Sequence, residues 1–386
     1  MVTKQRYRLG AGHFKTGNPL SRLTKDDFQR YLSPALLYRM AHPSLSPLER
    51  AIHSLADRES LSETMAAEAF AVVMAGAATP AQIGGLLLGL RAKGETVEEL
   101  TGAARALRGA MRRVVFEAPH LVDTAGTGGG VVTTFNISSG AALVAAGAGA
   151  TVAKHGNRSY TSRCGSADVF EALGVLIDLD PIVAVRALRE AGIAFLFAPN
   201  FHPAMRHVAP VRRELGVGTV MNLLGPLANP AGVRRQVIGV ADHARGPQMA
   251  EALIRLGADH ALVVHGRVGM DEISPTGPTD VWEARDGHVT AWTIRPETYG
   301  LAVTDEGSLG GALPQENAVR LERLLDGGND DAGRAAVLLN AGAAVYAAGL
   351  AESYGEGIAR ARAALHSGAA REALARLRRI SVSTSE

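Results

Sequence analysis

The segment that decides the fold is residues 120–147, HLVDTAGTGGGVVTTFNISSGAALVAAG. It starts with a short apolar run at residues 120–124, passes through a glycine-rich stretch at 125–130, and continues from about Asn136 as a helix of small residues. A strand, a glycine-rich turn and a helix in this order are typical of a parallel sheet covered by helices.

The glycine-rich stretch could also bind a phosphate group. Glycines let backbone N–H groups approach a phosphate closely, and the start of the following helix adds the positive end of its dipole. The stretch lacks the Gly-Lys-Ser/Thr ending of a P-loop and the glycine spacing of a dinucleotide fingerprint. A tight turn with a purely structural role is the alternative.

Further strand and helix patterns alternate toward the C-terminus, which predicts a mostly parallel central sheet with surrounding helices. The pattern at 281–294 predicts a hairpin with Asp286-Gly287 as its turn. One basic amphipathic helix is expected at 357–380. The other short apolar runs lie at residues 151–153, 194–198, 236–240 and 261–265.

The chain before residue 115 has only helical patterns. Thr79 and Thr96 each begin a capping box, and Gly94 between them is a stop signal, so we expect about four short helices here. The expected domains are a partly flexible extension at 1–45, a helical domain at 46–114 joined by helices from about 203–230, and an α/β domain at 115–386.

Composition excludes several classes of protein. The 386 residues include 40 Lys+Arg and 38 Asp+Glu, a balance that favours neither nucleic acid nor membrane as a partner. The single cysteine, Cys164, excludes an internal disulfide and a cysteine-based zinc cluster, and it fits a reducing, cytoplasmic setting. The first 25 residues are basic without an apolar core, so a basic tail is expected; an organellar transit segment is the alternative.

Two polar segments follow the glycine-rich stretch. Asn136-Ile137-Ser138-Ser139 could cap a helix, or could bind phosphate oxygens and the shell of a Mg²⁺ ion. The segment at 154–158, Lys-His-Gly-Asn-Arg, concentrates cations and amide donors directly after a strand, which favours anion binding over a solvated loop.

Two more candidates lie further along the chain. Arg212 could give a planar fork to a substrate carboxylate, although a basic helix face in solvent is the alternative. Asp271 and Glu272 follow a strand, and Mg²⁺ prefers such oxygen ligands; two exposed acids without a ligand are the alternative.

The order and wording of these segments closely resemble the anthranilate phosphoribosyltransferases. The resemblance extends from about residue 51 to about residue 350 and is dense over 123–283. The segments that carry it are Gly126-Thr-Gly-Gly129, Phe135-Asn-Ile-Ser138, Lys154-His-Gly-Asn-Arg158, Gly165-Ser-Ala-Asp168, Phe197-Ala-Pro-Asn-Phe-His202-Pro-Ala-Met, Asn222-Leu-Leu-Gly-Pro-Leu-Ala-Asn-Pro230 and Asp271-Glu272.

The resemblance implies a homodimer that transfers the phosphoribosyl group of phosphoribosyl diphosphate to anthranilate in tryptophan synthesis, with Mg²⁺ and with the site at the hinge between the domains. It implies no acid or base catalyst, since the aromatic amine already has a free lone pair near pH 7. The implied donor-binding residues are Gly126, Gly129, Gly130, Thr134, Asn136, Ile137, Ser138, Ser139, Lys154, His155, Gly156, Asn157, Arg158 and Ser166. The implied anthranilate contacts are Gly126, Asn157, Arg212, His155, His202 and Pro226, and the implied metal ligands are Ser138, Asp271 and Glu272.

One departure from the family pattern leaves alternatives open. The family usually has Asp-Gly where this chain has Gly130-Val131, so a carboxylate near the diphosphate is missing. Another amine or base could therefore be the acceptor. A non-catalytic nucleic-acid-binding relative is a further alternative; basic faces at 206–213 and 360–379 favour it, and the near-zero net charge of +2 counts against it.

Overall fold

The structure, a computed structural model, describes residues 45–159 and 163–382. The chain divides into two compact units, Met1–Leu45 and Ser46–Glu386, and the helices and strands below all belong to the second. The extension expected at 1–45 lies, except for Leu45, outside the described residues. No helix in the described ranges is long and apolar enough to cross a membrane.

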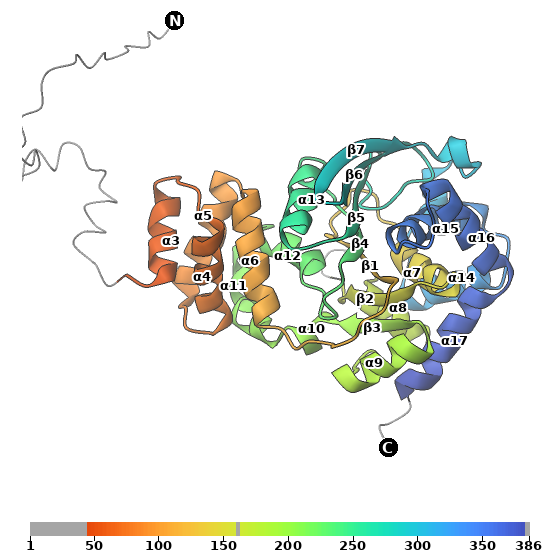
Figure 1. Cartoon of the computed structure of the whole chain (residues 1–386), viewed down its shortest axis with the longest axis horizontal. Coiled ribbons are helices and arrows are strands. Elements are labelled where there is room, and N and C mark those ends of the chain that lie inside the picture. Colours follow the sequence, from red (N-terminus) through yellow and green to blue (C-terminus); the bar gives the residue numbers. More distant parts are fainter. Residues whose placement is uncertain (1–44, 160–162, 383–386) are drawn as a thin grey trace, which may run out of the picture. The chain divides into compact units, whose positions relative to one another are not determined.

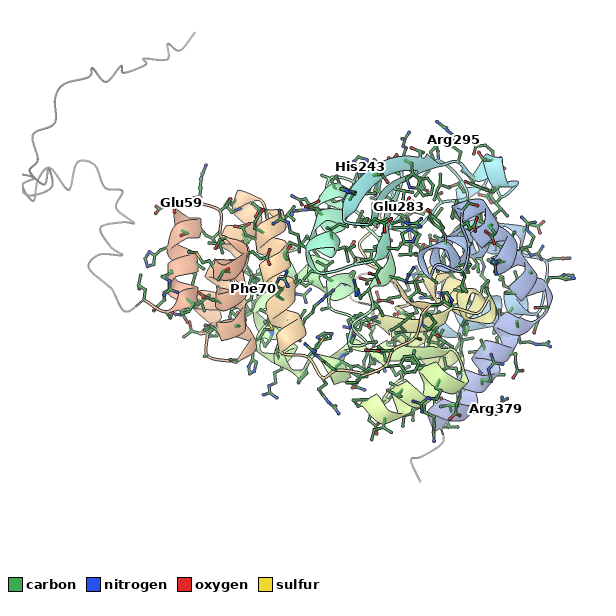
Figure 2. The ribbon with its side chains drawn as sticks, in the orientation of Figure 1. Glu59, Phe70, His243, Glu283, Arg295 and Arg379 are labelled. Atoms are coloured by element: carbon green, nitrogen blue, oxygen red, sulfur yellow. The ribbon has the colours of Figure 1, made fainter. Side chains whose placement is uncertain are left out.

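Between Ser46 and the first strand, four helices form a bundle (Figure 1). Thr79 and Thr96 both close capping boxes, and Gly94 ends a helix with φ +90°, as the sequence predicted. Phe70 lies inside the bundle (Figure 2) and is 0% exposed. The helices are α3 (Pro47–Ala56), α4 (Glu63–Met74), α5 (Pro80–Lys93) and α6 (Val97–Gly109).

The rest of the unit is built on a seven-stranded sheet with the order β3-β2-β1-β4-β5-β6-β7. The first five strands in this order are parallel, and β6 and β7 are antiparallel, which confirms the mostly parallel sheet. The predicted hairpin turn is confirmed, with Asp286 at φ 52° and Gly287 at φ 79°. The strands are β1 (Leu121–Gly126), β2 (Thr151–Gly156), β3 (Ile193–Phe197), β4 (Arg235–Gly239), β5 (His260–Gly266), β6 (Thr279–Arg285) and β7 (His288–Ile294).

Both faces of the sheet are covered, because alternate residues of a strand point to opposite sides. In β5, Leu262 and Val264 belong to a core that includes residues of α7 (Ile137–Gly147) and α15 (Asp331–Ala347). Ala261 and Val263 belong to a second core, shared with α13 (Arg245–Arg255) and the helical bundle. Because both faces of the sheet are buried, a ligand can reach the sheet only where its strands end.

The segment between β3 and β4 packs against the bundle. It contains α10 (Ala198–Phe201), a short 3-10 helix (Pro203–His207), α11 (Ala209–Leu215) and α12 (Met221–Leu227). Val208, Val211 and Leu224 belong to the same core as the bundle helices. We propose that this segment and residues 46–114 form one helical domain, with the remainder from 115 as the α/β domain.

The single helix expected at 357–380 is wrong. The structure has two helices there, α16 (Tyr354–His366) and α17 (Ala369–Val382), with Gly368 at φ +77° between them. Glycine adopts this left-handed backbone without steric cost, so the chain can turn. The turn brings the start of α17 so close to α7 that a Cβ on Gly147 would lie 2.6 Å from the backbone nitrogen of Ala370. The remaining helices are α8 (Ser166–Ala172), α9 (Pro181–Glu190) and α14 (Pro314–Leu325).

Candidate active site

The candidate residues gather at one edge of the sheet. Gly126, Gly156 and Gly266 are the last residues of β1, β2 and β5, three parallel strands. The carboxyl ends of parallel strands lie at the same edge, where open α/β sheets bind their ligands. The glycine-rich loop, the segment after β2 and the Asp271-Glu272 pair all follow these ends.

The glycine-rich loop is seated on Asp271. Gly128 and Gly129 have φ of 68° and 84°, and the N–H of Gly128 donates to Asp271 Oδ2 at 3.0 Å. A Cβ on Gly126 would lie 2.9 Å from the same oxygen, and one on Gly130 would lie 3.1 Å from Asp271 Oδ1. The absence of side chains at these positions therefore allows the carboxylate to approach the end of β1.

The first turn of α7 faces Glu272. Asn136 is the N-cap residue, but its side chain makes no capping bond and instead accepts from Asn317 Nδ2 at 3.0 Å. The N–H of Ser138 donates to Glu272 Oε1 at 3.3 Å, and the hydroxyl of Thr134 donates to Glu272 Oε2 at 2.9 Å. The positive end of the helix dipole thus stabilises a carboxylate here. Ile137 and Ser139 are buried in the same turn.

Lys154 lies in β2 rather than in a loop, and its side chain is 1% exposed. Its Nζ donates to the carbonyl of Thr124 at 2.6 Å and lies 3.4 Å from Ser138 Oγ. Burial lowers the pKa of Lys154 to about 8, while the charges of Asp123 and Glu272 act in the opposite direction. Ser138 is therefore a contact shared by the Lys-His-Gly-Asn-Arg segment and the acidic pair.

Asp271 and Glu272 are buried with little positive charge near them to offset their own. Burial raises the pKa of Asp271 and of Glu272, and the charge of Asp271 raises that of Glu272 further. In the described part of the chain no three His, Cys, Asp or Glu residues form a group that could hold a metal on their own. Mg²⁺ commonly uses one or two carboxylates and completes its shell with substrate phosphates and waters, so this donor set fits it.

The end of β2 carries a second group of predicted residues. Arg158 forms ion pairs with Asp168 at 2.9 Å and Glu171 at 2.5 Å, so its guanidinium is engaged on α8. Asn157 Oδ1 accepts from the N–H of Arg158 at 2.8 Å, and Ser166 Oγ donates to the carbonyl of Asn157 at 3.4 Å. A Cβ on Gly156 would collide with Ser166 Oγ and lie 2.8 Å from the ring of Phe195, so glycine allows β2 to pack closely here.

Two histidines lie beside α12. The rings of His155 and His202 are 5.0 Å apart, and His155 Nδ1 lies 3.2 Å from the carbonyl oxygen of Gly225. Burial lowers the pKa of His155 to about 3 and that of His202 to about 4, so both are neutral at pH 7. Pro226 is buried in α12 next to Gly225, and Arg212 lies partly exposed on α11.

Sequence reasoning missed a buried carboxylate and its partners. Asp123, in β1, accepts from the N–H of His155 at 3.1 Å and from Asn229 Nδ2 at 2.8 Å. Burial raises the pKa of Asp123 to about 6. The available signal was an acid inside the apolar run 120–124, since a carboxylate in a buried strand requires partners.

Comparison with known families assigns both parts of the chain. The profile described as "Glycosyl transferase family, a/b domain" matches residues 118–371. The profile described as "Glycosyl transferase family, helical bundle domain" matches residues 49–111.

Several relatives have an assigned activity or a solved structure. An anthranilate phosphoribosyltransferase of Rubrobacter xylanophilus is 51% identical over 335 residues, which cover 86% of this chain and 97% of the relative. The structure of that enzyme from Thermus thermophilus has a TM-score of 0.82 and 46% identity, covering 86% of this chain and 99% of the other. The Saccharomyces cerevisiae enzyme in complex with PRPP and Mg has a TM-score of 0.81 and 29% identity, with coverage of 89% and 100%. The same yeast enzyme in complex with 4-fluoroanthranilate has a TM-score of 0.79 and 27% identity, with coverage of 89% and 100%.

Proposed function

The chain belongs to the anthranilate phosphoribosyltransferase family, and we infer from this that it catalyses the reaction of that family. It transfers the 5-phosphoribosyl group of phosphoribosyl diphosphate to the amine of anthranilate, giving N-(5-phosphoribosyl)anthranilate and diphosphate, in tryptophan biosynthesis. The main structural support for this function is that Lys154 and Glu272 both contact Ser138, beside the glycine-rich loop.

We propose that the donor binds along the loop of Gly126, Gly129 and Gly130 and the first turn of α7. Glycine-rich loops that lead into a helix commonly bind phosphate oxygens through backbone N–H groups. Mg²⁺ held by Asp271, Glu272 and Ser138 would supply positive charge to the departing diphosphate. Lys154 adds a positive charge near Glu272. The remaining residues proposed for the donor are Thr134, Asn136, Ile137, Ser139, His155, Gly156, Asn157, Arg158 and Ser166.

For the acceptor we propose a site beside the same loop, next to α12. The uncharged rings of His155 and His202 with Pro226 suit a flat aromatic ring, and Arg212 is proposed to bind its carboxylate. Gly126 and Asn157 would complete the contacts. No residue is assigned as general base, because the amine of anthranilate is neutral near pH 7 and has a free lone pair. The residues here therefore position the amine for attack on the ribosyl carbon.

We also propose that the protein is a homodimer that works in the cytoplasm. The family resemblance supports the dimer, and a chain with the single cysteine Cys164 is compatible with a reducing compartment. Light scattering of the purified protein should give twice the mass of the chain, and the mass of a single chain would contradict the dimer.

The transfer can be followed directly, because the product lacks the fluorescence of free anthranilate. The wild-type protein should consume anthranilate only when phosphoribosyl diphosphate and Mg²⁺ are both present. The double variant Asp271→Ala, Glu272→Ala should lose this Mg²⁺-dependent turnover. A matched double variant of two exposed acids, Asp57→Ala with Glu59→Ala, should keep it. Full activity without Asp271 and Glu272 would refute the metal assignment, and an inactive wild-type protein would refute the function.

A further inference from the structure

Asn229, near the end of the Asn222–Pro230 segment, is only 3% exposed, yet every polar atom of its side chain has a partner. Its Nδ2 donates to Asp123 Oδ2 at 2.8 Å and to the carbonyl oxygen of Ala153 at 2.8 Å. Its Oδ1 accepts from the N–H of Ala231 at 2.8 Å. A buried amide with all three bonds made has a fixed orientation.

Asp123 extends this connection to the other side of the site. Its second oxygen accepts from the N–H of His155 at 3.1 Å, and it lies in β1, three residues before Gly126. One buried carboxylate thus joins β1, β2 and the chain that follows α12. The helix α12 itself is held at two more points, where His155 Nδ1 lies 3.2 Å from the carbonyl of Gly225 and Gln236 Nε2 donates to that of Pro226 at 2.8 Å.

We propose that Asn229 is a positioning residue for the transfer: held by Asp123, it fixes the end of α12, and with it the acceptor, against the strands that carry the donor. This inference rests on the proposed function. In-line attack requires the amine and the ribosyl carbon to be aligned, and a shift of about 1 Å can cost about 100-fold in rate. A residue that touches neither substrate can therefore control the rate.

The chemistry of the contact explains why an asparagine is present. Only a side chain that donates can satisfy both the carboxylate of Asp123 and the carbonyl of Ala153. An aspartate at position 229 would place a second carboxylate against Asp123 and leave the carbonyl of Ala153 without a donor, which weakens the buried contact between this segment and β1.

The test compares three variants of the full chain by steady-state kinetics and thermal unfolding. Asn229→Asp should lower kcat by at least about tenfold and raise the KM for anthranilate, with little change in the KM for phosphoribosyl diphosphate. The exchange Asp123→Asn with Asn229→Asp should recover part of the loss, because the amide at position 123 can then donate to the carboxylate at position 229, while the carbonyl of Ala153 remains without its donor. Thr101→Val removes a buried hydrogen bond inside α6, 2.7 Å to the carbonyl of Val97, and should lower Tm without changing the kinetic constants.

The outcomes separate positioning from mere stability. Asn229→Asp with wild-type constants and a lowered Tm, as expected for Thr101→Val, would overturn the inference. An exchange variant as slow as the single variant would overturn the pairing with Asp123. If Asn229→Asp does not fold, the smaller and neutral Asn229→Ser replaces it and should show the same pattern with a smaller amplitude; unchanged constants there would also overturn the inference. A wild-type protein without transfer activity would instead refute the proposed function.

Discussion

The charged side chains around Ser138 determine what the site can bind. The Lys154 ammonium and the Glu272 carboxylate contact this one residue, and Asp271 and Asp123 lie close by in the network. One buried cation therefore interacts with two carboxylates, those of Asp123 and Glu272, and burial raises the pKa of both and of Asp271. We expect a bound divalent cation to stabilise such a site.

Gly130 offers a test of this charge balance. A Cβ on Gly130 would lie 3.1 Å from Asp271 Oδ1, so Gly130→Asp would add a carboxylate beside the pair. We expect a lower Tm without Mg²⁺ and a larger rise in Tm on adding Mg²⁺ than in the wild type. Tenfold tighter Mg²⁺ binding adds about 1.4 kcal/mol at saturation. Gly130→Asn, equal in size but neutral, is the control, and equal rises in all three proteins would contradict the account.

The burial of His202 should make the free energy of unfolding depend on pH. Burial lowers its pKa from 6.5 to about 4, so between these values the unfolded chain binds more protons than the folded one. The free energy of unfolding should therefore fall as the pH falls through this window, by up to about 3 kcal/mol from this group. His202→Gln removes the effect. Urea unfolding at a series of pH values should show the wild type losing stability relative to the variant below pH 6.5; parallel curves would show that His202 is not buried in its neutral form.

Among the elements, those with a local signal could be predicted from the sequence. Thr79 and Thr96 began helices, and Asp286-Gly287 formed a hairpin turn, because a cap or a turn depends on a few adjacent residues. The break at Gly368 could not be predicted from the amphipathic pattern, which continues across it. What decides it is the packing of α17 on α7, a contact between segments far apart in the chain.

Gly368, at the break between α16 and α17, should affect the stability of the fold. Gly368 has φ +77°, so Gly368→Ala should lower the free energy of unfolding by about 1 kcal/mol. Gly109 is the matched control: it lies in α6 with nothing within 4 Å of an added Cβ, and Gly109→Ala should stabilise by about 0.5–1 kcal/mol. Urea unfolding measures both. A stabilised Gly368→Ala variant would mean that the left-handed turn is absent.

For the whole molecule, the sequence predicted which loops would meet but not how their side chains would be used. The glycine-rich loop and the acidic pair follow the ends of β1 and β5, and Lys154 lies near the end of β2, so their convergence follows from the topology. Sequence alone did not show that Lys154 is buried in β2, that Arg158 is engaged on α8, or that Asn229 bonds to Asp123. These details depend on packing between distant segments.

These loops are proposed to bind a diphosphate together with Mg²⁺. Titration calorimetry of phosphoribosyl diphosphate, with and without Mg²⁺, on the wild type and on Glu272→Gln tests it most directly. Mg²⁺ should tighten binding to the wild type by at least about tenfold, or about 1.4 kcal/mol, and should tighten binding to Glu272→Gln much less. Equal tightening by Mg²⁺ in both proteins, or no effect of Mg²⁺ on the wild type, would contradict the account.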